Sequence, residues 1–343
     1  MADSSRPLPA GKLPADLLAR LLPTVKQNDP RVIVGPRVGT DAAAIDMGTN
    51  VLIVKSDPIT FATEDAGWYL VNVNANDIAC MGGTPKWLLV TVLLPEHSTT
   101  PALVTNIFES LQRACAALNI ALVGGHTEIT IGIDRPLLIG SMLGEASHAD
   151  LIDPVSVRAG DAILLCKGIA IEGTALLARE SAPALLAGLD PDTLNRCRQF
   201  LVNPGISVVS TAAAIRSSGV HVKSLHDPTE GGIASALHEL CSAAGLGATV
   251  AMDAIKIYPE TLELCKALDL DPLGLIASGA LLAVVPPDAA ETVCSHLRAA
   301  GTPCAQIGTF NESPGEVVAT RNGSICEFPV FEVDEIARFF ARQ

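Results

Sequence analysis

Four aspartates stand where the sequence offers little structural reason for a charge. Asp41 follows a glycine turn, Asp57 ends an apolar run that is typical of a strand, and Asp77 lies in a helical segment of small and apolar residues. Asp227 comes directly before another helical segment, in HDPTEGG. A carboxylate buried in such places is costly unless it is paired or bound to a metal. Loops and strand ends are also where ligand-binding groups concentrate.

Carboxylates of this kind are the hard oxygen ligands that Mg²⁺ prefers, and Mg²⁺ usually completes its coordination with water and substrate phosphates. We therefore predict that Asp41, Asp57, Asp77 and Asp227 hold Mg²⁺ for a phosphate-bearing ligand. Structural explanations stay open, because Asp41 can be a turn residue and Asp227 can be the N-cap of the following helix. Asp77 is the hardest to explain structurally, since its helical neighbours are apolar.

A lysine accompanies one of these aspartates. Lys55 lies two residues before Asp57 in the same predicted strand, and the period of two places both side chains on one face. A lysine beside a metal-binding aspartate could hold a phosphate. The alternative is a solvated lysine at a strand end that pairs with a carboxylate.

A glycine pair follows the predicted strand Leu118–Val123. Gly124 and Gly125 would let backbone N–H groups approach an anion closely, and Thr127 adds a hydroxyl donor. The segment is therefore a candidate phosphate-binding loop. A plain connection between two strands has the same composition, and His126 fits a ligand contact or a satisfied structural histidine equally well.

The familiar short motifs for nucleotides and hydrolysis do not occur in the sequence. No P-loop GxxxxGK[ST] is present, and no GxGxxG opens a helix after a strand. HExxH, GxSxG and an EF-hand loop do not occur either. A nucleotide, if bound, would have to be held by a different arrangement, such as metal-bound carboxylates.

Composition and charge narrow the classes of partner. Of the 343 residues, 49% are hydrophobic and 17% are charged, which leaves ample apolar surface to bury and excludes a disordered chain. The net charge of −14 argues against nucleic acid as the main partner, because phosphate backbones need a basic surface. An acidic protein that handles nucleotide phosphates would need a cation between the two.

The apolar excess does not form a membrane segment. The longest apolar stretches, Trp87–Leu94 and Leu273–Val285, fall short of the roughly 18 residues of a spanning helix. The polar, proline-rich start does not resemble a signal peptide, so we expect a cytoplasmic protein with no membrane partner. Nine scattered cysteines without a CxxC spacing are then expected to be reduced and mostly buried. They are Cys80, Cys115, Cys166, Cys197, Cys241, Cys265, Cys294, Cys304 and Cys326.

Strands and helices alternate along both halves of the chain, which predicts two α/β or α+β domains. We place a short helical tail at 1–30, an N-terminal domain at 31–148 and a C-terminal domain at 160–343, with the polar segment 146–160 as the boundary. Trp87–Leu94 is predicted to be a fully buried strand and Asp65–Ala79 a helix. The other predicted strands are Asn50–Ser56, Leu137–Leu143, Asp161–Lys167, Leu281–Val285 and Thr302–Gly308. The other predicted helices are Pro14–Leu22, Pro101–Ala117, Glu172–Glu180, Ser181–Leu186, Asp192–Leu201, Gly205–Ser217, Gly231–Ala244 and Asp288–Ala300.

Six segments in order resemble the PurM-like superfamily. They are GTDAAAID, KSDPITFA, GWYLVNVNANDIACMGGTPKWLLVTVLLP, ALVGGHTEIT, VRAGDAILLCKGIAIEGTALLA and HDPTEGG, spread over about residues 35 to 245. That superfamily includes aminoimidazole ribonucleotide (AIR) synthetase, selenophosphate synthetase, thiamine-monophosphate kinase and the hydrogenase maturation protein HypE. The chain is most similar to the AIR-synthase-related proteins of the HypE-like group.

This resemblance implies a PurM-like N-terminal α/β domain and a PurM-like C-terminal α+β domain. It implies a homodimer with a barrel shared between the two N-terminal domains, and ATP with Mg²⁺ in a cleft near the dimer interface. The four aspartates match the magnesium ligands of the family, and Asp57, Asp77 and Lys55 are the predicted catalytic residues. The predicted contacts to the nucleotide are Lys12, Asn74, Asn76, Gly124, Gly125, His126 and Thr127.

The chain departs from its relatives at four places. One is His126, where thiamine-monophosphate kinase usually has an aspartate. Relatives usually have two acids where this sequence has Thr40-Asp41. HypE ends in a cysteine, whereas this sequence ends in Ala-Arg-Gln, so HypE chemistry on the chain's own C-terminus is not expected. The first cysteine is Cys80, so the N-terminal cysteine of selenophosphate synthetase has no counterpart.

Several functions fit this pattern. The favoured one is an enzyme that uses ATP and Mg²⁺ to phosphorylate an amide or carboxylate oxygen of a small molecule and so activate it. The alternatives are a kinase of the thiamine-monophosphate type and a nucleotide-binding accessory protein that needs a maturation-protein partner. The last alternative is that the aspartates are only structural and that nothing is bound.

Overall fold

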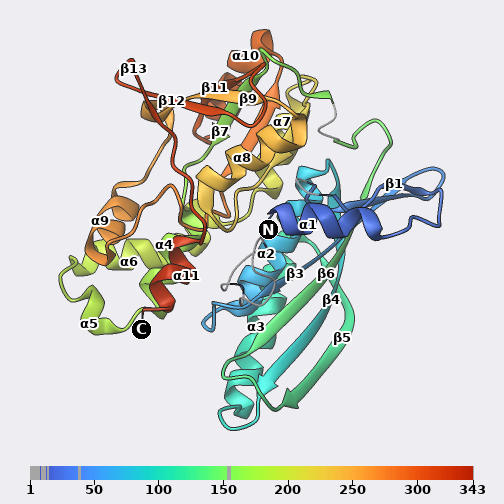
Figure 1. Ribbon diagram of the computed structural model, residues 1–343. Helices are drawn as coiled ribbons and strands as arrows, with labels where there is room; N and C mark the ends of the chain where they lie inside the picture. Colours follow the sequence, from blue (N-terminus) through green and yellow to red (C-terminus); the bar gives the residue numbers. More distant parts are fainter. Residues whose placement is uncertain (1–7, 9–12, 14, 38–39, 153–155, 343) are drawn as a thin grey trace.

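The computed structural model describes residues 8, 13, 15–37, 40–152 and 156–342. Each half of the chain is built around one β-sheet, and Figure 1 shows the two halves side by side, with the helix α2 (Ala66–Cys80) near their junction. No helix in the described ranges is long and apolar enough to cross a membrane. The mixed α/β and α+β architecture confirms the predicted fold class. The exact domain limits stay a prediction.

The N-terminal half forms a six-stranded sheet in the order β1-β2-β3-β6-β4-β5. Its strands are β1 (Val32–Val34), β2 (Ala43–Asp46), β3 (Val51–Ile59), β4 (Thr84–Pro95), β5 (Ala121–Thr130) and β6 (Leu137–Ala146). The neighbours pair antiparallel except β4 and β5, which are parallel. The helices α2 and α3 (Pro101–Leu118) cover one face of this sheet, and α1 (Ala15–Leu21) precedes it, as predicted.

The C-terminal half forms a seven-stranded sheet in the order β13-β12-β9-β11-β7-β10-β8. Its strands are β7 (Ala162–Cys166), β8 (Ser224–His226), β9 (Gly247–Ala251), β10 (Leu281–Val285), β11 (Cys304–Asn311), β12 (Val317–Arg321) and β13 (Ser324–Glu327). Its helices are α4 (Ile171–Glu180), α5 (Pro183–Leu186), α6 (Pro191–Gln199), α7 (Val209–Ser217), α8 (Gly232–Ala244), α9 (Pro259–Leu268), α10 (Ala290–Ala299) and α11 (Glu335–Phe340). The sequence patterns did not predict β8, β9, β12, β13, α9 or α11 in this half, nor β1 and β2 in the other sheet.

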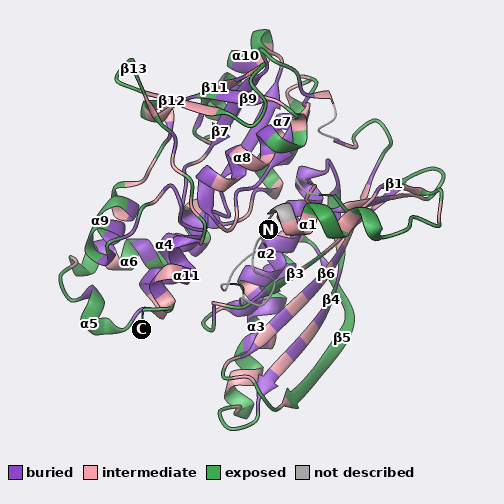
Figure 2. Ribbon diagram, viewed as in Figure 1, coloured by how far each residue is buried: buried purple, intermediate pink, exposed green. Residues whose placement is uncertain are grey.

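The helix α2 is the central element of the molecule. Nearly every residue of α2 is buried, and Figure 2 shows the helix almost entirely in the colour of buried residues. It packs against β3, β4 and β6 of its own sheet, and against α7 and β8 of the C-terminal half. A helix that is buried on all sides belongs to the core of a protein. The polar residues inside α2 therefore need partners, and these partners define the candidate site.

Two of the predictions about strands are corrected by the structure. The strand β4 is not fully buried, because only alternate residues face α2 and α3, while Trp87 and Leu89 on the other face are 37% and 40% exposed. The glycine pair is not a loop after a strand, since β5 continues through Gly124 and Gly125 to Thr130. A bulge in the β4–β5 register makes this continuation feasible.

Gly125 shows why this strand needs a glycine. Its φ of +147° is a conformation that other residues rarely adopt, and a Cβ atom there would lie 1.9 Å from the Val90 carbonyl oxygen. The glycine pair therefore has a structural reason, which is the close approach of β5 to β4. This finding alone neither requires nor excludes a phosphate contact.

Candidate active site between the two halves

The four predicted metal ligands come together from four separate elements. Asp41 precedes β2, Asp57 lies in β3, Asp77 lies in the last turn of α2, and Asp227 follows β8. Their charges act on one another and on Lys55, so the five groups form one electrostatic cluster. Three of the acids come from the N-terminal half and Asp227 from the C-terminal half, which places the cluster at the junction.

Lys55 bridges two of the acids. Its Nζ atom lies 3.2 Å from Asp57 Oδ2 and 3.1 Å from Asp77 Oδ2. The side chain of Asp77 is 5% exposed and that of Asp57 is 31% exposed, so the pair spans the buried base and the open side of the site. Lys55 is therefore not a solvated lysine at a strand end; it is a partly buried cation, 20% exposed, between two carboxylates.

Asp41 has a different partner. The Nδ1 atom of His226 lies 3.0 Å from Asp41 Oδ1, and the Nε2 atom of His226 lies 3.3 Å from Glu239 Oε2. Burial alone would lower the pKa of His226, but the neighbouring acids, first of all Asp41, raise it well above its usual value. The imidazole is therefore held as a cation between two carboxylates. His226 orients the Asp41 carboxylate toward the junction.

Asp227 is the least compensated of the four acids. Its Oδ2 atom is buried and has no hydrogen-bond partner within the described part of the chain. The thiol of Cys80 donates to its Oδ1 atom at 3.6 Å. The helix α8 begins after Gly231, so Asp227 is not its N-cap, and the N-cap explanation for this residue is wrong.

Burial disfavours the ionised form of three of these acids, Asp57, Asp77 and Asp227. Burial raises the pKa of Asp57 and, more strongly, that of Asp77, while Lys55 opposes both shifts. Burial and the Asp41 carboxylate raise the pKa of Asp227 to about 7. A divalent cation at the junction would offset these costs, because an opposite charge favours the ionised form.

Asn74 and Asn76 are fully buried in α2 and bind backbone groups. The Oδ1 atom of Asn74 accepts from the Asp57 N–H at 3.0 Å, which fixes the strand beside the site. Asn76 reaches the C-terminal half, donating to the Ile206 carbonyl at 2.9 Å and accepting from the Val208 N–H at 2.8 Å. Both amides thus position the site in this structure, and their contact with a nucleotide stays a prediction.

The glycine segment lies apart from the aspartates in the described chain. Gly124, Gly125, His126 and Thr127 line a groove of about 380 Å³ under α3, and none of the four aspartates lines it. His126 is exposed, with Nε2 lying 3.1 Å from Glu128 Oε2. One chain therefore does not bring the predicted phosphate-binding segment and the predicted metal ligands into one pocket. Lys12 lies outside the described residues.

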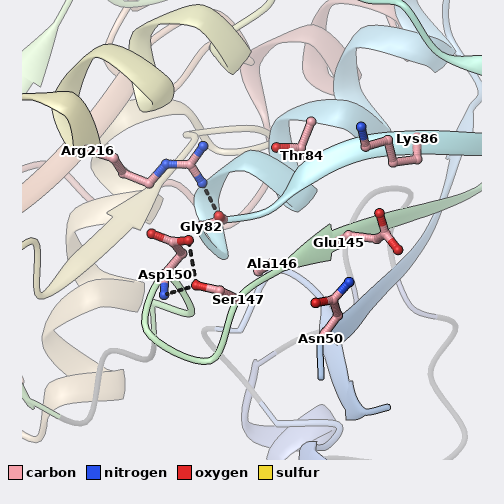
Figure 3. Close-up of a pocket in the computed structure, with 9 residues that line it drawn as sticks. All are labelled: Asn50, Gly82, Thr84, Lys86, Glu145, Ala146, Ser147, Asp150 and Arg216. Atoms are coloured by element: carbon pink, nitrogen blue, oxygen red, sulfur yellow. Dashed lines mark hydrogen bonds between the residues drawn. The ribbon is translucent and has the colours of Figure 1, made fainter. Parts of the chain in front are cut away.

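A second hollow lies on the junction, lined by polar residues that the sequence did not single out. It measures about 320 Å³, and Figure 3 shows its side chains converging from both halves of the chain. Arg216 of α7 donates to the Gly82 carbonyl there, and Ser147 and Asp150 bond to each other. Its lining contains none of the predicted site residues, and the hydrogen bond from Arg216 to Gly82 joins the two halves.

Other residues near the cluster escaped the sequence analysis. Glu172 and Ser278 are buried, and burial raises the pKa of Glu172 to about 8. Cys80 stands one helical turn after Asp77, and that spacing was the signal that both face the same way. His226 and Glu172 gave no such signal, since their partners are distant in the sequence.

The sequence matches two parts of one protein family. Residues 39–146 match the N-terminal domain of AIR synthase related proteins, and residues 158–321 match the C-terminal domain. A hydrogenase expression/formation protein of Methanocaldococcus jannaschii is 28% identical over 75% of this chain and 75% of its own length. The carbamoyl dehydratase HypE of Rhodobacter capsulatus is 29% identical over 76% of this chain and 74% of its own.

Solved structures share the fold at lower identity. A HypE–HypF complex has a TM-score of 0.69 at 22% identity and covers 85% of this chain and 94% of that chain. HypE in complex with ATP has a TM-score of 0.65 at 23% identity, covering 88% and 92%. The enzyme AaThiL, complexed with AMPPCP and TMP, has a TM-score of 0.67 at 18% identity, covering 85% and 90%.

The fold, the order of the domains and the matches agree. Both family domains occur in one chain, in the expected order, and each contains all but the first or last strand of one of the two sheets. The predicted resemblance is thereby confirmed. The chain belongs to the AIR synthase related proteins, and within them it is a PurM-like protein of the HypE type.

Proposed function

We propose that the protein uses ATP and Mg²⁺ to phosphorylate an amide or carboxylate oxygen of a small molecule, and so makes that oxygen a leaving group. The observation that carries this proposal is the convergence of Asp41, Asp57, Asp77 and Asp227 with Lys55 at one junction. Transfer of a phosphoryl group depends mainly on positioning and electrostatics, so it requires no protein nucleophile.

The residues present fit a divalent metal. The buried Asp227 Oδ2 atom has no hydrogen-bond partner in the described chain, and Lys55 stands between Asp57 and Asp77 where a cation is needed. Mg²⁺ would be held by these carboxylates and would neutralise the charge of the nucleotide phosphates. Metal between Asp57 and Asp77 would free Lys55 to contact a phosphate.

The rest of the chain prepares the site. Asn74 fixes the backbone of Asp57, and Asn76 ties α2 to the loop before α7. The carboxylates from the two halves can then act together only when the halves are docked. This rigid arrangement supplies the fixed dipoles and charges on which phosphoryl transfer depends.

We further propose that the working form is a homodimer. The strand β5 forms the edge of its sheet and is exposed along nearly its whole length, as Figure 2 shows. Two of its exposed residues are apolar: Val123 is 54% exposed and Ile129 is 60% exposed. The open face of β4 adds Trp87 and Leu89. An exposed apolar edge strand of this kind invites pairing with another chain. A second copy would also bring its glycine segment to the aspartates of the first.

Two relatives favour neighbouring functions. AaThiL is a structural neighbour complexed with AMPPCP and TMP, which supports a small-molecule kinase as the second candidate. A HypE–HypF complex supports a maturation protein as partner of this chain. We place the protein in the cytoplasm, because all nine cysteines are free and reduced thiols persist there.

The test is binding and turnover of ATP by the purified chain with Mg²⁺. Calorimetry should show ATP binding that requires Mg²⁺ and is lost when Asp57→Asn and Asp77→Asn are combined. The matched control combines Asp134→Asn and Asp288→Asn, two exposed acids away from the site, and should keep full affinity. Undiminished binding in the first double variant would contradict the site.

Product analysis then separates the candidate functions. A panel of small amides, carboxylates and phosphorylated alcohols is incubated with Mg²⁺ and ATP, and the products are weighed by mass spectrometry. ADP with a dehydrated or cyclised product supports activation, and a stable phosphoester supports the kinase. ADP release only after HypF-like partner protein is added supports an accessory protein.

A further inference from the structure

A thiol faces the metal site from the last turn of α2. The Sγ atom of Cys80, one carboxylate oxygen of Asp41 and one of Asp227 all lie within 4.8 Å of one another. Cys80 is 1% exposed and Asp227 is 2% exposed, whereas Asp41 is partly open. The three atoms are therefore close enough for one ion to contact all of them, and Asp41 is the most exposed of the three residues.

The second observation is the unpartnered carboxylate. The Oδ1 atom of Asp227 accepts a hydrogen bond from the Cys80 thiol at 3.6 Å, and its buried Oδ2 atom has no partner in the described chain. A buried carboxylate oxygen without a hydrogen bond is costly, so its neighbourhood is arranged for a ligand that the chain itself does not supply. A thiol proton alone satisfies only half of this carboxylate.

The ligand set is softer than magnesium needs. Mg²⁺ takes oxygen ligands and keeps several waters, whereas thiolate sulfur suits Zn²⁺ and the neighbouring transition metals. His226 holds Asp41 through Nδ1 and is held in turn by Glu239. At transition-metal sites, hydrogen bonds of this kind from neighbouring side chains orient the residues that bind the metal.

We propose that Asp41, Cys80 and Asp227 form a site for a thiophilic divalent ion such as Zn²⁺ or Co²⁺. This site is distinct from the Lys55–Asp57–Asp77 side of the cluster, where all the acceptors are oxygens. Binding displaces the thiol proton to solvent and forms one metal–sulfur bond. The proposal rests on the proposed function in one respect, because both assign Asp41 and Asp227 as metal ligands.

The test uses Co²⁺ alone, added to the full-length chain without an affinity tag and with its thiols kept reduced by a phosphine. Wild type should develop a thiolate-to-cobalt charge-transfer band in the near ultraviolet that saturates at one equivalent. Cys80→Ser should lose the band and should bind Zn²⁺ at least about ten-fold more weakly. Asp227→Asn should also weaken the cobalt affinity, which keeps the test decisive if Cys80→Ser does not fold.

The matched control is another buried thiol with close sulfur neighbours. Cys304 lies 3.2 Å from Cys294 and 3.7 Å from Cys166, sulfur to sulfur, so it is the other place where a soft ion could bind. Cys304→Ser should keep the band. A band that persists in Cys80→Ser, or the absence of any band in wild type, would overturn the proposal.

The two proposals fail separately. Loss of the cobalt band together with intact binding of Mg²⁺ and ATP would remove only the thiophilic site. A normal cobalt band in a chain that does not bind ATP would remove only the proposed function.

Discussion

Lys55 Nζ lies 3.1 Å from Asp77 Oδ2 and so joins the strand β3 to the buried end of the helix α2. Burial alone would lower the pKa of Lys55, yet Asp77, Asp57 and Asp41 together raise it. The lysine is therefore charged and serves as the cation of the site. A buried ion pair of this kind is sensitive to the removal of one partner, because the other charge is left uncompensated.

Removal of the lysine charge gives the first prediction. Lys55→Met should lower the free energy of unfolding by roughly 3–5 kcal/mol, since Asp77 loses its counter-charge. Added Mg²⁺ or Mn²⁺ should restore more stability to this variant than to wild type, because a divalent ion can take the place of the ammonium. Urea denaturation with and without metal measures both effects.

The control for this prediction is Lys86→Met. Lys86 lies in β4 and makes no ion pair within the described residues, so its loss should change stability by less than about 0.5 kcal/mol. Equal losses in the two variants, or no metal rescue of Lys55→Met, would contradict the role of Lys55 as the cation of the site.

The second prediction concerns the junction between the halves. Asn76→Ala leaves the Ile206 carbonyl and the Val208 N–H without their partner, which should lower the free energy of unfolding by about 2–4 kcal/mol. Asn72→Ala is the matched control, because Asn72 is similarly buried in α2 and donates to the Trp68 carbonyl one turn away in the same helix. Chemical denaturation compares the two.

The two asparagine variants should also differ in the pattern of unfolding. Loss of the Asn76 bridge should separate the unfolding of the two halves, so that tryptophan fluorescence from Trp68 and Trp87 and far-ultraviolet circular dichroism no longer coincide. A single coincident transition with the same loss as Asn72→Ala would show that Asn76 does not couple the halves.

Some of this site could be read from the sequence for a physical reason. The helix α2 has small and apolar residues on every side, so an aspartate within it stands out as a group that needs a partner. Asp57 and Lys55 share a strand face through the period of two, and their ion pair follows directly. The helix α3 follows from the 3.6-residue periodicity of its apolar residues, and in the structure Thr100 caps it by accepting from the Leu103 N–H.

Other parts could not be read from the sequence, because they depend on distant contacts. An apolar run such as β4 looks the same whether both faces are buried or one face is left open for a partner. The sequence of the glycine pair in β5 predicts a turn. In the structure a glycine is needed there because Gly125 lies very close to Val90 on the neighbouring strand. Cys80 and Asp227 meet across 147 residues of sequence, and only the tertiary structure shows that contact.

The third prediction follows from the pKa of Glu172, which burial raises from 4.5 to about 8. Between pH 4.5 and pH 8 the folded chain keeps a proton on Glu172 that the unfolded chain has lost. The contribution of Glu172 to stability therefore falls as the pH rises through this range. Glu172→Gln stays neutral at every pH. The stability of the variant relative to wild type should therefore rise as the pH goes from 4.5 to 8, by an amount on the order of 5 kcal/mol.

Denaturation at several pH values checks the Glu172 prediction. The control is Glu263→Gln, since Glu263 is exposed on α9, and its difference from wild type should stay flat over the same range. A Glu172→Gln difference that is equally flat, or that falls with rising pH, would show that the carboxyl is ionised in the folded chain.

The fourth prediction concerns the exposed edge strand. Ile129→Arg in β5 and Trp87→Arg in β4 should each reduce the mass measured by light scattering from that of a homodimer to that of one chain, because a charge in an apolar interface is not compensated. The control is Ile325→Arg in β13, a residue that is 81% exposed in the other sheet, and it should leave the dimer intact.

The same variants decide whether the second copy completes the site. The glycine segment of one chain does not share a pocket with that chain's aspartates, so a monomeric variant should bind ATP with Mg²⁺ at least about ten-fold more weakly although its aspartates are unchanged. Calorimetry on monomeric Ile129→Arg and dimeric Ile325→Arg measures this difference. A monomer with full ATP affinity would mean that one chain holds the nucleotide alone, and a dimeric Ile129→Arg would mean that the copies meet elsewhere.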